Sequence, residues 1–397
     1  MRSRRLWIGL GLAAVVTLVG ARAVAFLNAR PTQPTAPAAE TVRAVRGGGE
    51  LVVLRTTLVD ADRHKELPIR IVFAEGTAAP ADAPDALDEE AGGSDAGEQA
   101  PEPLPLIVFS HGMYGSGENL DPLAHHWASH GYVVILPTHA DSLSLRTAGM
   151  SRLEKMQLAR EMQSGRLRDM NTQFQAHWAD RPRDVQLILD SLDAIEKLDG
   201  RLAGRIDRER IGVGGHSFGA MTTMLIGGAE PINVPRALEQ EFERDGLLAD
   251  ERVKCVLMIS PQGINQRFGP ESWDAFDLPA LTISGDRDRG SGGQPAEWRR
   301  HAFDLGHAGS HALVWIEGAE HHFGGMTGAT RRGQASVPEH VKAVQDATLA
   351  FWESSLRGDE QDAGALAAWL KKALVGQRVR VEFRKGEAGE SDARADR

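Results

Sequence analysis

One serine of the chain stands in a pattern typical of catalytic nucleophiles. Ser217 is the central residue of Gly-His-Ser-Phe-Gly at 215–219, the single Gly-x-Ser-x-Gly of the sequence. A strand-like apolar run, 211–214, precedes it, and a helix-like run, 220–226, follows. A sharp strand-to-helix turn exposes the hydroxyl, and the flanking glycines let neighbouring backbone come close. The pattern predicts a nucleophilic serine; a glycine-rich turn capped by a serine is the alternative.

A serine hydroxyl needs a base near neutral pH, and in this arrangement the partners follow in the order serine, acid, histidine. Asp288 and His321 each come shortly after a predicted strand. Asp288 would orient and stabilise the imidazole, and His321 would take the serine proton. Asp286 and His322 compete for these two roles, since each lies close by in the sequence.

The negative charge that develops on a carbonyl oxygen needs backbone N–H donors. We expect one from Phe218, directly after the serine, and one from the glycine-rich loop 110–117 that follows an early strand. In that loop we choose the amide of Met113, with Tyr114 as the second choice. The alternative is a flexible loop without a role.

The elements that must hold these residues alternate between short apolar runs and helical patterns. An antiparallel hairpin is predicted at 51–59 and 67–73. The later predicted strands are 104–109, 132–136, 211–214, 253–259, 281–283 and 311–316, and the predicted helices are 119–129, 182–198, 218–226, 295–305 and 338–356. This alternation predicts an α/β fold with a mostly parallel central sheet flanked by helices, and a site at the carboxyl ends of the strands.

The domain predicted to carry this sheet spans 51–375. Within it, 74–103 holds nine acidic residues and no Lys or Arg, which predicts a disordered insert, and 142–181 reads as a helical insertion. That insertion contains four methionines, a residue common at surfaces that accept varied apolar ligands: Met150, Met156, Met162 and Met170. Ordinary packing with a solvated outer face is the alternative. A linker is predicted at 31–50 and a polar tail at 384–397.

The first thirty residues predict export. Arginines precede an apolar run, 6–20, and small residues at 21–25 fit a cleavage site, which is the layout of a signal peptide at 1–30. An uncleaved membrane anchor is the main alternative and a cytoplasmic protein the third. The first two place the domain in the periplasm, in the cell envelope or outside the cell.

Composition excludes several classes of protein. The net charge is −10, most of which comes from the acidic insert, so the basic face of a nucleic-acid binder is not expected. A hydrophobic fraction of 42% excludes an intrinsically disordered protein. The single cysteine, Cys255, excludes an intrachain disulfide and a cysteine-based zinc site. No metal or cofactor is predicted: His126 and His130 share a helix face without an acidic ligand, and no dinucleotide-binding motif occurs.

The chain resembles the α/β-hydrolase superfamily, and within it the branch of platelet-activating-factor acetylhydrolases and dienelactone-hydrolase-like secreted esterases. The strings that carry the resemblance are Asp-Ala-Asp-Arg at 60–63, Leu-Pro-Ile-Arg at 67–70, Phe-Ser-His-Gly at 109–112, Pro-Thr-His-Ala-Asp-Ser at 137–142, Arg-Pro-Arg-Asp-Val at 181–185 and Gly-His-Ser-Phe-Gly at 215–219. The resemblance implies ester or thioester-like acyl substrates and a serine acyl-enzyme.

The chain departs from the acetylhydrolases in one respect. Their acid follows the strand after the nucleophile helix, whereas here the run 253–259 ends in Ser-Pro-Gln-Gly at 260–263, without a carboxylate. Asp288, one strand later, fits the commoner hydrolase layout. This difference brings the chain closer to generic and polyester-type secreted esterases.

Three functional hypotheses follow. The first is a serine hydrolase that cleaves small-molecule or lipid-like carboxylic esters. The second is a peptidase or amidase on the same fold, and the third is a non-catalytic binding module.

Overall fold

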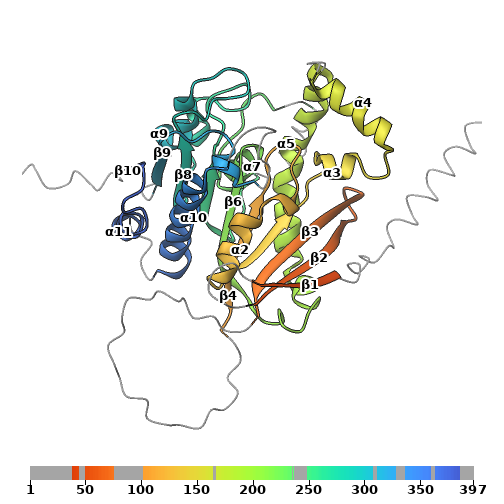
Figure 1. Ribbon diagram of the computed structural model, residues 1–397, viewed down its shortest axis with the longest axis horizontal. Coiled ribbons are helices and arrows are strands. Elements are labelled where there is room, and N and C mark those ends of the chain that lie inside the picture. Colours follow the sequence, from red (N-terminus) through yellow and green to blue (C-terminus); the bar gives the residue numbers. More distant parts are fainter. Residues whose placement is uncertain are drawn as a thin grey trace, which may run out of the picture.

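The computed structural model describes residues 38–43 (backbone only), 50–75, 102–163, 167–234, 236, 248–306, 311–327, 336–358 and 363–384. They form a single ten-stranded sheet in the order β1-β2-β3-β5-β4-β6-β7-β8-β9-β10 (Figure 1). The strands are β1 Ala38–Arg43, β2 Glu50–Asp60, β3 Lys65–Ala74, β4 Leu104–Ser110, β5 Val133–Pro137, β6 Ile206–His216, β7 Val253–Ile259, β8 Ala280–Gly285, β9 His311–Ile316 and β10 Val379–Phe383.

The middle of the sheet is parallel and its two margins are antiparallel. β5, β4, β6, β7, β8 and β9 run in one direction. The hairpin β2–β3 adds to β5 antiparallel, β1 adds to β2, and β10 closes the other margin against β9. The parallel strands are almost wholly buried, as expected where helices cover both faces. The predicted α/β fold is confirmed.

The helices cover the two faces of the sheet. They are α2 Asp121–Ser129, α3 Leu143–Arg146, α4 Arg152–Gln163, α5 Leu167–Asp190, α6 Leu192–Glu196, α7 Phe218–Ile226, α9 His301–Leu305, α10 Pro338–Trp352 and α11 Ala363–Ala373. Short 3-10 helices are η1 Gly117–Asn119, η2 Pro270–Trp273, η3 Ala296–Arg300 and η4 Phe323–Gly325, and η5 Glu353–Arg357 is a π-helical turn that follows α10. Buried side chains of α5, α6 and α7 form one core on one face of the sheet. Those of α2, α10 and α11 form a second core on the other face (Figure 1).

Several predicted boundaries are wrong. Pro182 was expected to start a helix, but it lies inside α5. The preceding turn is held by tertiary burial, since Trp178 and Arg181 are buried, and this outweighs the backbone hydrogen bond that proline removes. β1 lies within the predicted linker 31–50, and β10 lies beyond the predicted domain end at 375.

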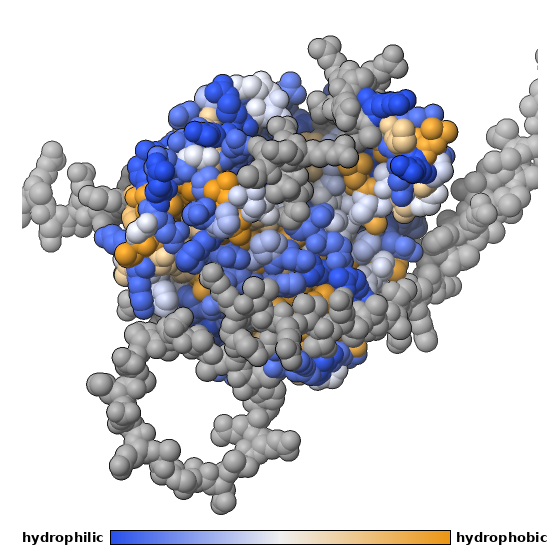
Figure 2. Space-filling view, viewed as in Figure 1, coloured by the Kyte–Doolittle hydropathy of each residue, from blue (hydrophilic) through white to orange (hydrophobic). Residues whose placement is uncertain are grey.

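The helical insertion extends beyond the edge of the sheet. Residues 142–181 hold α3, α4 and the first part of α5, which project at the upper right of Figure 1. Exposed apolar side chains gather there, as Figure 2 shows: Leu145, Met150, Leu153 and Met156. Among the described residues no helix has both the length and the apolarity of a membrane span. The predicted signal segment, most of the acidic insert and all but the first residue of the polar tail lie outside the described residues.

Candidate active site

Ser217 lies at a strained turn between β6 and α7. Its φ of 55° is in the left-handed region, which non-glycine residues rarely adopt. A Cβ on Gly215 would lie 2.2 Å from the Gly219 carbonyl, and a Cβ on Gly219 would lie 2.0 Å from the Ser110 carbonyl oxygen. Only glycine fits at either position, because real Cβ atoms essentially never come so close. The two glycines therefore let the turn pack tightly enough to expose the serine.

The structure brings Ser217, His321 and Asp288 into one chain of hydrogen bonds. The Nε2 atom of His321 lies 3.0 Å from the Ser217 Oγ, and its Nδ1 atom lies 2.8 Å from an Asp288 carboxylate oxygen. The Asp288 side chain is fully buried, whereas 31% of the His321 side chain is exposed. The carboxylate is thus sealed from water while the imidazole and the hydroxyl face the cleft.

The two competing residues take other positions. The exposed Asp286 accepts the Gly318 amide hydrogen at 2.7 Å, so it braces the turn after β9. His322 lies 3.3 Å from the Thr327 hydroxyl through Nδ1 and lines the cleft. The geometry therefore favours Asp288 over Asp286 and His321 over His322.

Buried polar groups that the sequence did not single out surround Asp288. Ser260, directly after β7, donates its hydroxyl to one carboxylate oxygen and lies 2.8 Å from Nδ1 of His321. Ser284 donates to the same carboxylate oxygen at 2.9 Å. Burial raises the pKa of Asp288, but the hydrogen bond from His321 and the charge of Arg299 outweigh it and lower the pKa to about 2. Asp288 is therefore ionised at neutral pH.

Arg299 fixes the loop that presents Ser260. Its guanidinium is almost fully buried and donates to the carbonyls of Ser260 and Pro261 at 3.0 and 3.1 Å. Its Nε lies 3.4 Å from the Asp288 carboxylate. Arg299 thus ties the end of β7 to the acid that follows β8.

His216, the residue before the serine, supports the loop that carries His321. Its Nε2–H donates to the His321 carbonyl at 2.8 Å, and the two rings lie 4.8 Å apart. Burial and the neighbouring imidazole of His321 lower the pKa of His216 well below its ordinary value. A neutral imidazole can serve as a fixed donor here, without placing a second positive charge beside His321.

The loop after β4 passes directly beside the serine. A Cβ on Gly112 would lie 3.5 Å from the Ser217 Cβ and 3.0 Å from the His216 ring, so a glycine permits this close approach. The Tyr114 amide donates to Asp141 at 3.2 Å. Among the described residues the Met113 amide is bonded to no acceptor, so the geometry favours Met113 over Tyr114 as a donor to substrate.

A buried ion pair holds this loop in place. Arg181 donates to both carboxylate oxygens of Asp141 at 2.8 Å and to the His111 carbonyl at 2.6 Å. Its guanidinium also packs over the Phe218 ring, 4.4 Å from the centroid. Burial raises the pKa of Asp141, yet the charge of Arg181 outweighs it and the net shift is downward. Arg181 thereby contacts both segments predicted to supply oxyanion donors.

A second polar chain lies beneath the loop. His139 lies 3.0 Å from the Ser110 hydroxyl through Nε2 and 2.8 Å from Asp184 through Nδ1, and Lys65 pairs with Asp184 at 2.7 Å. His139 and Asp141 are each 1% exposed, and neither lines the cleft over Ser217.

The comparisons agree with this architecture. Residues 93–257 match the family model described as platelet-activating factor acetylhydrolase, isoform II. The chain has the α/β-hydrolase fold. No protein in the curated set matches it. The matched segment is less than half of the chain; it includes Ser217 and the loop 110–117 and ends before Asp288 and His321.

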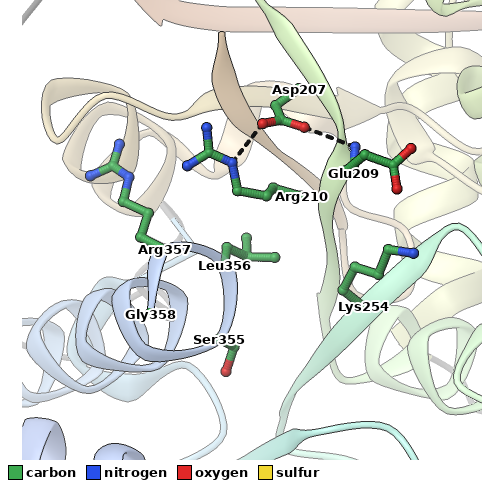
Figure 3. Close-up of a pocket in the computed structure, with 8 residues that line it drawn as sticks. All are labelled: Asp207, Glu209, Arg210, Lys254, Ser355, Leu356, Arg357 and Gly358. Atoms are coloured by element: carbon green, nitrogen blue, oxygen red, sulfur yellow. Dashed lines mark hydrogen bonds and ion pairs between the residues drawn. The ribbon is translucent and has the colours of Figure 1, made fainter. Parts of the chain in front are cut away.

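An open cleft lies over Ser217. The cleft has a volume of about 670 Å³ and is lined by the loop after β4, the loop after β8 and the turn that carries His321. A smaller hollow of about 300 Å³ lies at the amino ends of β6 and β7, on the opposite edge of the sheet. Figure 3 shows that Asp207, one of the charged groups lining it, pairs with Arg210 and accepts the Glu209 amide. The cleft over Ser217 is therefore the one that can present a substrate to the candidate residues.

Proposed function

We propose that this α/β-hydrolase is a serine hydrolase that cleaves carboxylic esters through an acyl-enzyme. The observation that carries the proposal is the unbroken hydrogen-bonded chain from the Ser217 hydroxyl, at the lining of the cleft, through His321 to the buried, ionised Asp288. The family whose model matches is named for an acetylhydrolase, which supports esters over amides as the substrate class.

Each residue takes a defined part in the proposed reaction. Ser217 Oγ attacks the ester carbonyl while His321 Nε2 takes its proton. The amides of Met113 and Phe218 donate to the oxyanion that forms. The intermediate collapses, the C–O bond breaks, and His321 returns the proton to the departing alcohol. Water then attacks the acyl-enzyme with His321 as base, which releases the acid and restores Ser217.

Asp288 serves this cycle by holding the imidazole. Its carboxylate accepts from Nδ1, which leaves Nε2 as the acceptor of the serine proton, and its charge stabilises the imidazolium that forms. Because Ser260, Ser284 and Arg299 already satisfy the carboxylate, Asp288 can stay ionised although it is fully buried.

A Ser217→Ala substitution tests the proposal. We expect turnover of p-nitrophenyl acetate and butyrate to fall by about three or more orders of magnitude, with the melting temperature unchanged. Ser291→Ala is the matched control, since Ser291 lines the same cleft and is exposed. Wild-type rates in the Ser217→Ala protein would refute the mechanism.

Two further measurements separate the alternatives. A p-nitroanilide with the same acyl group should be cleaved far more slowly than the ester; comparable rates would favour an amidase. A fluorophosphonate probe should label wild type and not Ser217→Ala. A folded wild-type protein that fails to label would favour a non-catalytic binding module.

Export of the domain is also a proposal, supported by the arginines and the apolar run at the start of the sequence. Fractionation of cells that express the full chain with a C-terminal tag tests it. Recovery of the tagged chain in the cytoplasm alone would contradict it.

A further inference from the structure

Two arginines flank the buried acid and face the cleft. Arg287 and Arg289 stand on either side of Asp288, and both line the cleft over Ser217. Both residues are exposed, whereas Asp288 points inward to His321. Among the described residues neither guanidinium forms an ion pair, while most other arginines there are paired with a carboxylate.

The charge of the cleft lining differs from that of the chain. The whole chain carries a net charge of −10. The lining of the cleft holds Arg287, Arg289 and Arg299, and among its residues Glu320 is the acidic one. The charge of Arg299 is directed at Asp288, which leaves Arg287 and Arg289 to act on a molecule that enters the cleft. The cleft is therefore cationic in an acidic protein.

Other residues of the cleft lining are apolar or aromatic. Met113 and Tyr114 come from the loop after β4, and the Met113 side chain is 40% exposed. Trp298 adds an indole ring whose N–H is already satisfied by the Ile264 carbonyl. A substrate in this cleft thus meets both apolar surface and positive charge in the lining.

We propose that Arg287 and Arg289 form an anion subsite, and that the preferred substrates are esters carrying a carboxylate or phosphate group. A guanidinium presents planar N–H donors that match these anions, and such charge-assisted hydrogen bonds are stronger than neutral ones. The inference rests on the proposed esterase function and adds the substrate class. The subsite acts on binding and leaves the chemistry to Ser217.

Matched pairs of esters test this subsite. Mono-p-nitrophenyl glutarate is compared with p-nitrophenyl pentanoate, which places the charge on the acyl side. 4-Carboxyphenyl acetate and 4-acetoxyphenyl phosphate are compared with 4-methylphenyl acetate, which places it on the alcohol side and distinguishes a carboxylate from a phosphate. The wild-type enzyme should show a KM about tenfold lower for at least one anionic ester than for its neutral partner, an advantage that shrinks at high salt.

The variants Arg287→Gln, Arg289→Gln and the double variant should remove that advantage. We expect KM for the anionic ester to rise about tenfold in the double variant, with kcat and the neutral ester changed by less than about twofold. Arg208→Gln is the control, because it removes the same charge from an exposed ion pair at the amino end of β6. Equal KM values for charged and neutral esters, in wild type and in the double variant, would overturn the subsite. Absence of turnover on every ester would instead refute the proposed function itself.

Discussion

Replacement of Arg181 by glutamine should damage both stability and activity, because this side chain joins a buried carboxylate to the proposed oxyanion loop. Arg181 and Asp141 are each 1% exposed, and the guanidinium bonds to Asp141 and to the His111 carbonyl. An uncompensated buried charge costs about 3–5 kcal/mol. For a domain of this size, about 2–4 °C of melting temperature per kcal/mol predicts a fall of roughly 10 °C.

The same substitution should also slow the reaction. Without Arg181 the His111 carbonyl loses a hydrogen-bond donor and the Phe218 ring loses its contact with the guanidinium. The Met113 and Phe218 amides would then no longer be held in the orientation that the oxyanion requires. The loss of one oxyanion donor costs about 10²–10³ in kcat, and we expect a fall near the lower value because the loop is displaced and not removed.

Circular dichroism melting and p-nitrophenyl butyrate hydrolysis measure the two effects. Arg210→Gln is the matched control: its ion pair with Asp207 spans 2.6 Å but is 30% and 19% exposed, so it should cost no more than about 1 kcal/mol. The double variant Arg181→Gln/Asp141→Asn removes the stranded charge and should recover much of the melting temperature while kcat stays low. Full activity in a destabilised Arg181→Gln protein would refute the link to the oxyanion loop.

Two further predictions concern the acid and the pH dependence of stability. Ser260→Ala removes a hydroxyl that lies between Asp288 and His321, so kcat should fall about tenfold. Ser284→Ala removes a hydrogen bond to the carboxylate alone, so its loss of kcat should be smaller. Each variant should lower the free energy of unfolding by about 1.5–3 kcal/mol. Equal kcat values in the two variants would contradict the bridging role. Burial lowers the pKa of His111 and His216 well below 6.5, so below that pH the unfolded chain binds more protons and stability falls by up to about 1.4 kcal/mol per pH unit for each. Urea unfolding at pH 7.5, 6.5 and 5.5 measures this; a constant free energy of unfolding would contradict it.

Residues with a local signal were predictable from the sequence. The run 253–259 and the helix after Ser217 have the predicted bounds, because apolar runs between turn residues identify buried elements directly. Asp288 and His321 were placed by strand order alone, since the carboxyl ends of parallel strands share one edge of the sheet.

Residues that act through distant contacts left no such signal. Arg181 forms a hydrogen bond with Asp141, 40 positions earlier in the sequence, and Ser260 contacts His321, 61 positions later. The sequence predicts a helix start at Pro182, a position that proline favours, and only the tertiary burial of the preceding turn shows that the helix begins earlier. β10 carries a signal, the alternation of Val379, Val381 and Phe383, but charged residues separate them and the sequence analysis predicts no strand there.

The hydrogen-bonded set Ser110–His139–Asp184, beneath the loop 110–117, has a consequence for searches that identify catalytic triads by interatomic distances. Its hydroxyl, imidazole and carboxylate are separated by 3.0 and 2.8 Å, as in the set built on Ser217. Yet all three side chains are at most 1% exposed, and Ser110 ends a regular strand with no bent corner to lift it. A search by distance alone would select both sets, but only the set built on Ser217 lines a cleft that a solute can enter. Exposure to the cleft, and not interatomic spacing, distinguishes the proposed catalytic set from the buried one in this molecule.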